Sequence, residues 1–255
     1  MKRKLHFLLA VGIGLTTSVG WLHAANVVTA EDAADLLTKV AAANDGDTIK
    51  LKVQHYELDQ QLVINKGIVL YGTNDGPNYS MISANPNAEW TKKENGEIDN
   101  SKANLISIVG GTSGQTVKLE NLVVYGSMAS GINAQSTMKT VLKVVTVERS
   151  KNAALLVHSA VEAEALLTRD NGWGSVNVDQ GSTDYSPNFK FFDSNFMAYE
   201  PYKIWTELTT TENVVTVPGN SNWKTYTINA TVVDGVEKEK AKKYWVQSGL
   251  DMEYV

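Results

Sequence analysis

The chain has 255 residues, none of them cysteine, and a formal net charge of -5 at pH 7. Without cysteine it can form neither a disulfide framework nor the acylated N-terminus of a lipoprotein. The acidic balance argues against nucleic acid as a partner, because phosphate binding depends on an excess of lysine and arginine.

Residues 1–24 have the pattern of a secretory signal peptide. Three positive charges in Met1–Lys4 precede an apolar or small-residue stretch over Leu5–Val19, and Leu22–Ala24 offers a small residue for cleavage. This stretch is too short for a membrane span, and no second apolar run of about 20 residues follows it. We therefore expect a secreted, bacterial extracellular protein without a transmembrane anchor, whose mature chain begins at Ala25.

Cleavage also changes the charge of the chain. It removes three of the 23 basic residues and leaves 20 against 28 acidic residues, a net charge of -8. Such a surface favours a neutral glycan or a protein partner over an acidic polymer such as pectate, unless a local basic patch or bridging cations intervene.

The first element of the mature chain is predicted to be an amphipathic helix over Thr29–Ala43. Thr29 and Asp32 have the spacing of a capping box, and apolar residues then recur at helical intervals. These residues are Ala33, Leu36, Leu37 and Val40. Because the open end of a solenoid core must be covered, we interpret residues 25–46 as an N-terminal cap.

From Asp47 the pattern changes to short β-type runs separated by glycine and asparagine, at Thr48–Leu51, Leu62–Ile64 and Ile68–Gly72. A long polar loop, residues 73–104, is predicted to follow. It contains Trp90 and several acidic residues, among them Asp75, Glu94, Glu97 and Asp99. These acids lack EF-hand spacing, so we expect no cofactor and a solvated loop, with calcium binding there as the alternative.

A repeat then returns after 23 and next after 21 residues on three separate tracks. The tracks are Leu119/Leu142/Ala163, Leu122/Val145/Leu166 and Ile132/Leu155/Val176. Apolar and polar residues alternate around them, as in half-buried strands. Strands separated by a full coil must pair in parallel with their copies, so residues 47–200 are predicted to form a β-solenoid.

Charge supports this register. The 23- and 21-residue register stacks residues of opposite charge on neighbouring strands about 4.8 Å apart, where they attract each other. A 20-residue offset would instead place Arg149 on Arg169. The stacked groups are Glu120/Lys143/Glu164, Glu148/Arg169 and Arg149/Asp170. We therefore interpret Arg149 and Arg169, the only arginines of the mature chain, as structural ion-pair partners rather than catalytic bases.

Beyond Tyr199 the repeat fades, and residues 201–255 are predicted to cover the far end of the stack. This interpretation rests on several aromatic and apolar residues and on a stretch, Val236–Val246, with helical features. The residues are Trp205, Trp223, Tyr226 and Ile228, with Glu239 and Lys243 at i,i+4 spacing in the helical stretch.

Residues 30–205 resemble the pectate-lyase-like right-handed parallel β-helix superfamily, in particular its bacterial secreted and surface members. The resemblance is carried by DGDTIKL (45–51), LVINKGIVLYG (62–72), LKVVTVERS (142–150), ALLVHSA (154–160) and NGWGSVNVDQGS (171–182). It implies an all-β, right-handed parallel β-helix. It does not fix an activity, because the superfamily includes lyases, hydrolases, esterases and binding modules. Neither a lyase calcium site nor the paired carboxylates of a hydrolase are recognisable.

The candidate site is the outward face of the third track, Ile132/Leu155/Val176. Alternation points a row of amides and other polar groups outward there, next to an aromatic residue in a glycine-flanked turn, which suits stacking on a sugar and bonding of its hydroxyls. The candidate ligand-binding residues are Asn133, Gln135, His158, Trp173, Asn177 and Asp179. The simpler interpretation is a surface polar ladder, with Trp173 covering a core edge.

No catalytic residue is assigned, and the alternative is an acid/base pair of His158 and Asp179, because a carboxylate orients an imidazole. We expect a monomeric, non-catalytic module that binds a polysaccharide or a cell-surface component, or mediates surface contacts. The alternatives are a polysaccharide lyase or hydrolase and a purely structural spacer.

Overall fold

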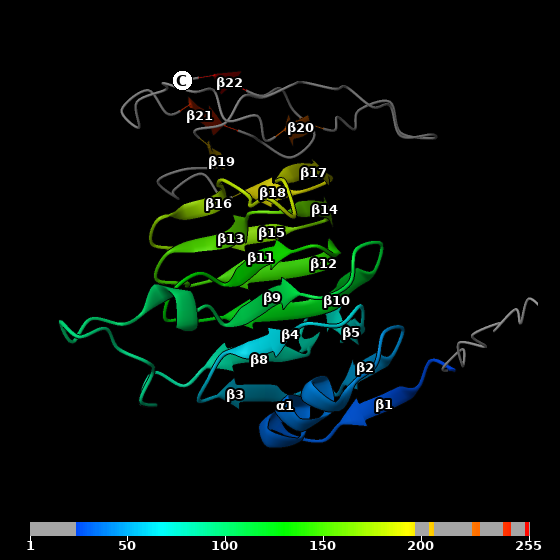
Figure 1. Cartoon of the computed structure of the whole chain (residues 1–255). Coiled ribbons are helices and arrows are strands. Elements are labelled where there is room, and N and C mark those ends of the chain that lie inside the picture. The colour runs from blue at the N-terminus through cyan, green and yellow to red at the C-terminus, as the bar shows by residue number, and fades with distance from the viewer. Residues whose placement is uncertain (1–23, 197–203, 207–225, 230–241, 246–252, 255) are drawn as a thin grey trace, which may run out of the picture.

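The computed structural model describes residues 24–196, 204–206, 226–229, 242–245 and 253–254. They form a parallel β-solenoid of about 7 turns, in which each coil of the chain stacks on the previous one (Figure 1). The signal-peptide assignment falls on residues that lie, apart from Ala24, outside the described part of the chain. No helix in that part is long and apolar enough to cross a membrane.

Each full coil contributes one strand to each of three faces. The first face contains β2 (Thr48–Leu51), β5 (Val69–Tyr71), the first halves of β10 (Thr116–Tyr125) and β12 (Lys139–Glu148), β14 (Ala160–Glu164) and β17 (Asn188–Phe192). The second face contains β3 (His55–Leu58), β8 (Met81–Ala84), the second halves of β10 and β12, β15 (Leu167–Arg169) and β18 (Asn195–Phe196). The third face contains β4 (Leu62–Ile64), β9 (Ile106–Gly110), β11 (Ile132–Ser136), β13 (Ala153–Val157), β16 (Gly174–Val178) and β19 (Ile204–Thr206).

In the later coils, the chain turns from the first face to the second through a single residue with left-handed backbone geometry. The corner residues of four successive coils are Asn121, Val144, Ala165 and Asp193, with φ of 54°, 52°, 53° and 47°. One such residue redirects the chain without a loop, so β10 and β12 each run through the corner as one bent strand.

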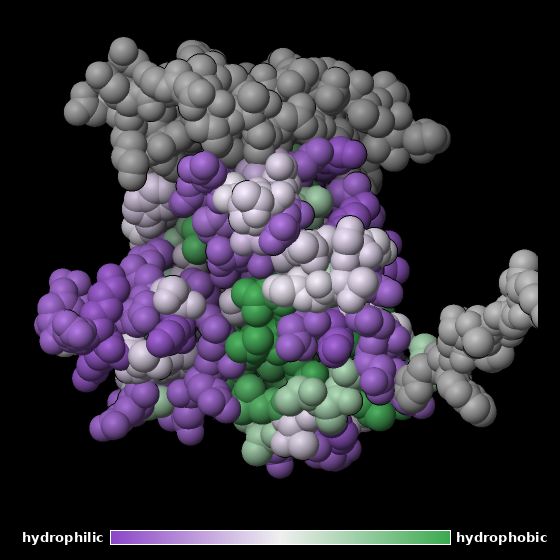
Figure 2. Space-filling view, viewed as in Figure 1, coloured by the Kyte–Doolittle hydropathy of each residue, from purple (hydrophilic) through white to green (hydrophobic). Residues whose placement is uncertain are grey.

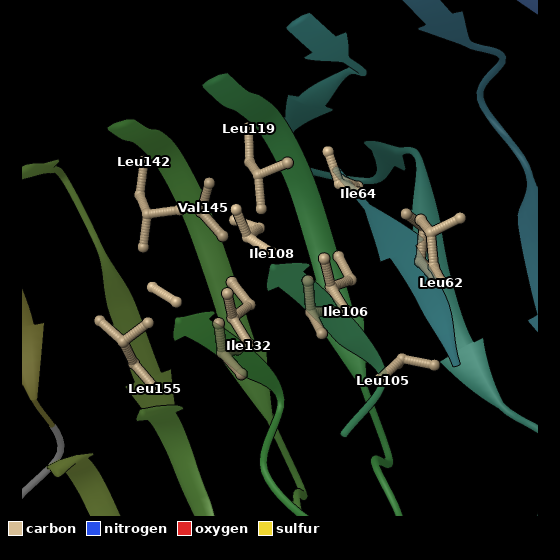
Figure 3. Close-up of a cluster of buried hydrophobic side chains, with 14 of the residues drawn as sticks. Leu62, Ile64, Leu105, Ile106, Ile108, Leu119, Ile132, Leu142, Val145 and Leu155 are labelled. Carbon is tan, nitrogen blue, oxygen red and sulfur yellow. The ribbon is translucent and has the colours of Figure 1, made fainter. Parts of the chain in front are cut away.

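Strand pairing confirms the predicted register. Leu119 pairs with Leu142 and Leu142 with Ala163, while on the third face Ile132 pairs with Leu155 and Leu155 with Val176. These side chains are buried, and Figure 3 shows Leu119 and Leu142 on neighbouring strands, with Ile132 and Leu155 from the third face in the same interior. The three faces thus enclose one continuous hydrophobic core.

The predicted charge stacking is also confirmed. Lys143 lies between Glu120 and Glu164 in the ladder and forms an ion pair with Glu164 at 3.5 Å. The Arg169 guanidinium donates two hydrogen bonds to Glu148, at 2.7 and 3.0 Å, in the bidentate geometry that suits arginine and carboxylate. The Arg149 Nε atom lies 4.0 Å from the Asp170 carboxylate.

The helix near the start of the described residues is shorter than predicted. Helix α1 spans Ala33–Ala42, and Asp32 is its N-cap. Thr29 lies in strand β1 (Val27–Ala30), so the prediction of a capping box formed by Thr29 and Asp32 is wrong. Residues 27–30 extend because they pair in parallel with β2, and that pairing outweighs the local capping pattern. Helix α1 still lies at the first end of the stack (Figure 1) and buries Leu36 and Val40 in the core.

The expectation of one loop over residues 73–104 is wrong, because β8 interrupts it. Two short strands, β6 (Asn74–Asp75) and β7 (Asn78–Tyr79), form a hairpin, and then β8 pairs with β3 and β10 in the stack. A second excursion, residues 85–104, follows and contains the 3-10 helix η1 (Asn100–Lys102). Trp90 is buried in the core and donates a hydrogen bond from Nε1 to the Asn85 carbonyl oxygen.

The C-terminal strands add to the far end of the stack in the opposite direction. Strand β20 (Tyr226–Asn229) pairs antiparallel with β17, β21 (Lys242–Trp245) pairs antiparallel with β19, and β22 (Glu253–Tyr254) pairs with β21. The helical interpretation is therefore wrong for residues 242–245, whose aromatic residues also favour a strand. Trp223, Glu239 and residues 236–241 lie outside the described residues.

We predict that Leu142→Ala lowers the free energy of unfolding by about 2–5 kcal/mol, because it leaves a cavity in a fully buried column. Lys143→Ala, the matched control at the adjacent exposed position, removes a surface ion pair and is expected to cost about 0–1 kcal/mol. Denaturant unfolding followed by circular dichroism measures both. Equal, small losses for the two variants would show that Leu142 does not lie in the core.

We predict that Val144→Asn raises stability by about 0.5–1 kcal/mol. A β-branched residue is strained at positive φ, whereas asparagine tolerates this geometry and already occupies the equivalent corner at Asn121. Val141→Asn, in the regular part of the same strand, is the control and is expected to lower stability. A Val144→Asn variant that melts below the wild-type protein would contradict the strain argument.

Candidate functional site

A pocket of about 210 Å³ lies on the outer side of the third face, and we call it the third-face pocket. Its walls come from strands β11 and β13, from the turns that lead into them and from the end of the 85–104 excursion. The excursion projects at the left of Figure 2 and has a largely hydrophilic surface. It is lined by Asn100, Ser101, Asn104, Ser130, Asn133, Gln135, Asn152, Leu156 and His158. Apart from His158, no lining residue is ionisable.

The pocket contains three of the six candidate residues. Asn133, Gln135 and His158 line it, whereas Trp173, Asn177 and Asp179 are not among the lining residues. The register itself is as predicted: Asn133 pairs with Leu156, Leu156 pairs with Asn177, and all three lie on the outer side of the sheet. Although these residues are neighbours in the ladder of paired strands, their side chains do not all line the same pocket.

Asn133 is the most informative residue of the pocket. It alternates with Ile132 and Ala134, which are in the core, yet it is only 5% exposed, and residues of the 85–104 excursion line the same pocket. Its Nδ2 atom donates to Ser107 Oγ at 3.3 Å and to Gln135 Oε1 at 3.5 Å, while its buried Oδ1 atom accepts no hydrogen bond. A buried acceptor without a donor costs about 1–3 kcal/mol. Because Asn133 Oδ1 itself is buried, a ligand hydroxyl recovers that cost only when the Asn133 amide turns toward the pocket.

His158 is oriented by a backbone carbonyl rather than by a carboxylate. Its Nδ1 atom lies 2.9 Å from the Gln180 carbonyl oxygen and must donate there, so in the neutral ring Nε2 remains as an acceptor. The Asp179 carboxylate instead accepts from the Gln180 N–H at 2.7 Å. Both residues belong to the described part of the chain, and the hydrogen bond between them that an acid/base pair requires is not formed.

Trp173 is half-buried and lies at the start of β16. Its backbone N–H donates to the Asn152 carbonyl oxygen at 3.3 Å, and this bond continues the strand ladder between the turns that lead into the third face. Trp173 is not among the residues that line the third-face pocket.

A larger hollow of about 440 Å³ lies on the outer side of the second face, and we call it the second-face cleft. Its floor is formed by β8, β10, β12 and β15, and its wall by the β6–β7 hairpin. It is lined by Asn74, Gly76, Tyr79, Met81, Val123, Tyr125, Thr146, Glu148, Arg149, Leu167 and Arg169. Arg149 and Arg169 therefore both border this cleft.

The charged groups of the cleft differ in how far they are neutralised. Glu148, which is 8% exposed, is held by two hydrogen bonds from Arg169. Arg149 donates from Nη1 to the Tyr125 hydroxyl at 3.0 Å, and its guanidinium carbon lies 5.7 Å from the centroid of the Tyr125 ring. The predicted ion pairs are thus correct, but the same arginines also form a site that the sequence reasoning did not consider.

One signal in the sequence could have revealed the cleft. The outward positions of the second face include Met81, Val123 and Leu167, which is unusual for a strand surface in water. Apolar residues on an outer face indicate that another segment or a ligand lies next to them, and here the β6–β7 hairpin borders them.

The two hollows differ from a glycosidase site in their carboxyl groups. Among their lining residues Glu148 is the sole carboxylate, and Arg169 neutralises it, whereas glycoside hydrolysis ordinarily uses two carboxyl groups. Within the described residues no group of three or more His, Cys, Asp or Glu side chains is placed to hold a metal ion.

Comparison of the chain with protein-family models gave no match, and comparisons with curated proteins and with solved structures gave none either.

Proposed function

We propose that this chain is a secreted, non-catalytic β-helix module that binds a neutral glycan of an extracellular polysaccharide or cell surface in the third-face pocket. The observation that carries the proposal is the buried Asn133 Oδ1 atom, which lacks a hydrogen-bond donor although its residue lines the pocket. A sugar hydroxyl is a donor of the right size and can also accept a hydrogen bond in return.

The chemistry of the lining favours a neutral ligand. Carboxamide groups and serine hydroxyls both donate and accept, as the hydroxyl groups of a sugar do, and the pocket offers no lysine, arginine or carboxylate to an ion. Leu156 supplies an apolar surface on which the C–H groups of one sugar ring can rest. At about 210 Å³ the pocket suits one small unit of a chain rather than a long segment.

The proposal also includes the type of β-helix, the secretion of the protein and its oligomeric state. The stack of about 7 turns, together with DGDTIKL (45–51) and NGWGSVNVDQGS (171–182), supports a right-handed, pectate-lyase-like β-helix. The pattern of residues 1–24 supports secretion from a bacterium and a mature chain that begins at Ala25. We propose that the mature protein acts as a monomer.

We predict that Asn133→Leu weakens binding of the best neutral ligand on a glycan array by about threefold to tenfold or more, because a hydrogen bond and the shape of the pocket are lost. Its stability should stay within about 1 kcal/mol of the wild-type value, since the substitution removes an unpaired polar atom. Gln135→Ala should weaken binding as well. Titration calorimetry and thermal unfolding measure the two quantities.

The matched control is Asn177→Ala, which changes an amide in the same outward column but outside the pocket lining. It should bind like the wild-type protein. Unchanged binding by a folded Asn133→Leu variant would remove the third-face pocket from consideration. Release of unsaturated or reducing ends from a polysaccharide panel, with or without calcium, would replace the binding module by a lyase or hydrolase.

A further inference from the structure

The floor of the second-face cleft is largely apolar and runs along the solenoid axis. It consists of register neighbours on four successive coils: Met81, Val123, Thr146 and Leu167. Because neighbouring strands lie about 4.8 Å apart, these positions span about 14 Å. An extended polypeptide covers that length with about four residues. The floor therefore has the size and the apolar character of a site for a short stretch of chain.

The polar groups beside this floor are already engaged with one another. The Asn74 Nδ2 atom donates to the Val144 carbonyl oxygen and to Thr146 Oγ1, both at 3.3 Å. Glu148, which is 8% exposed, accepts two hydrogen bonds from Arg169. A ligand covered with hydroxyl groups would lose hydrogen bonds to water without recovering them on such a floor, so the cleft favours a ligand with an apolar body.

The wall of the cleft is held in place before a ligand arrives. The hydrogen bonds of Asn74 attach the β6–β7 hairpin to the bend of β12. At the base of the hairpin, Thr73 and Ser80 are linked by two hydrogen bonds, of 2.7 and 3.0 Å. A preformed cleft loses little conformational entropy when it binds a flexible chain.

The lining of the cleft carries one positive charge in excess. Glu148 and Arg169 offset each other, which leaves Arg149. The Arg149 side chain is 62% exposed, and its Asp170 partner, 43% exposed, approaches no closer than 4.0 Å and does not line the cleft. An exposed pair of this kind is weak and competes little with a ligand. Of the five guanidinium N–H groups of Arg149, one donates to Tyr125, so the group has capacity for an oxyanion.

The backbone at Arg149 indicates that this arginine serves a purpose other than stability. Its φ is 56°, and the equivalent positions one coil before and one coil after are Gly126 and Asp170, with φ of 69° and 58°. Left-handed geometry strains an arginine, and glycine avoids that strain. The corner thus accepts glycine, as it does at Gly126, yet carries a strained arginine beside the cleft.

The ligand that fits this charge has a single carboxylate and no ammonium group close to it. The planar fork of a guanidinium matches a carboxylate, while the net negative charge of the chain repels a polyanion. Among the described residues that line the cleft, Glu148 is the sole carboxylate, and Arg169 neutralises it. The α-ammonium group of a free amino acid would therefore find no partner. The C-terminus of a longer polypeptide meets both requirements, because its amino group lies far away.

The positive charge and the floor are about one residue apart. Val123 on the floor and Tyr125, which accepts a hydrogen bond from Arg149 at 3.0 Å, are successive outward residues of β10. Such residues lie about 6.6 Å apart along a strand. An α-carboxylate on Arg149 thus leaves the side chain of the same residue over the floor. Tyr125 and Tyr79, which is 40% exposed on the hairpin, both line the cleft, and tyrosine is common at the centre of protein interfaces.

We propose that the second-face cleft binds the C-terminal end of a partner polypeptide, with the free carboxylate on Arg149 and an aliphatic last side chain on the floor at Val123 and Leu167. Capture of a chain end is a recurring mode of peptide recognition, and it selects proteins with an accessible C-terminal tail. This site lies on another face of the solenoid than the third-face pocket and does not depend on the function proposed for that pocket.

The test measures the fluorescence anisotropy of short labelled glycine–serine peptides that end in leucine as the free acid, in leucine amide, or in serine as the free acid. We expect wild-type protein to bind the leucine acid and to bind the amide about tenfold or more weakly. The serine peptide should bind about threefold to tenfold more weakly, because its side chain buries less apolar surface. Failure of the leucine acid to bind below about 1 mM would overturn the proposal.

Two variants separate the charge from the floor. Arg149→Gly should lose about tenfold or more in affinity for the leucine acid and should no longer distinguish the acid from the amide. It should melt at or above the wild-type temperature, since glycine relieves the left-handed strain. Leu167→Thr should instead reduce the preference for leucine over serine and retain the preference for acid over amide. Unchanged affinity in a folded Arg149→Gly variant would contradict the proposed site.

Asp170→Gly is the matched control, because it places glycine at the equivalent left-handed position one coil away. It should bind the leucine acid at least as tightly as wild-type protein, since it removes the competitor for Arg149. Asn133→Leu should leave peptide binding intact. A loss in Asn133→Leu would place the peptide in the third-face pocket and refute the assignment to the second-face cleft.

Two small competitors test the source of the carboxylate. Octanoate offers a carboxylate on an alkyl chain, and free leucine offers the same side chain with an α-ammonium group beside the carboxylate. Both should displace the labelled leucine acid at least about tenfold less well than the unlabelled peptide does. Equal displacement by octanoate would replace the polypeptide by a lipid carboxylate, and equal displacement by free leucine would replace it by an amino acid.

Discussion

Parallel pairing of each strand with its own copy one coil away is the constraint on which this structure depends. Since neighbouring strands lie about 4.8 Å apart, every side chain must be compatible with the residues directly above and below it. Leu142 therefore lies between Leu119 and Ala163 inside the stack, while Lys143 lies between Glu120 and Glu164 outside it. The same rule that builds the core thus also arranges charge on the surface.

Neither candidate site is made by the regular coils alone. The strands provide flat outer faces, and the two excursions that flank β8 turn parts of those faces into hollows: the β6–β7 hairpin borders the second-face cleft, and the end of residues 85–104 borders the third-face pocket. One short region of the sequence therefore shapes both sites. Separate faces allow the two sites to carry different chemistry, with neutral amides around Asn133 and a guanidinium at Arg149.

The sequence was informative wherever the signal was periodic. Alternation and charge were enough to predict the pairing of Leu119 with Leu142 and of Glu148 with Arg169, because both follow from the spacing of equivalent residues. Burial of Asn133 was not predictable, since alternation assigns a face but does not show which segment covers it. Similarly, β8 was missed because Met81–Ala84 is a short run inside a polar region, and Thr29 was misassigned because strand pairing outweighed local capping.

The one-residue corner at Asn121, Val144, Ala165 and Asp193 makes the faces of the solenoid differ in how easily their strands detach. Along β10 and β12 it fuses the first and second faces into one hydrogen-bonded ribbon, whereas the third face is joined to the first through turns of varied length, such as residues 137–138 and 179–187. Thermal fluctuations will therefore detach strands of the third face more readily than they split the ribbon at its bend. We expect the amide hydrogens of β11 and β13 to exchange with solvent faster than those in the middle of β10 and β12. The third face is then the side of the solenoid that opens most easily.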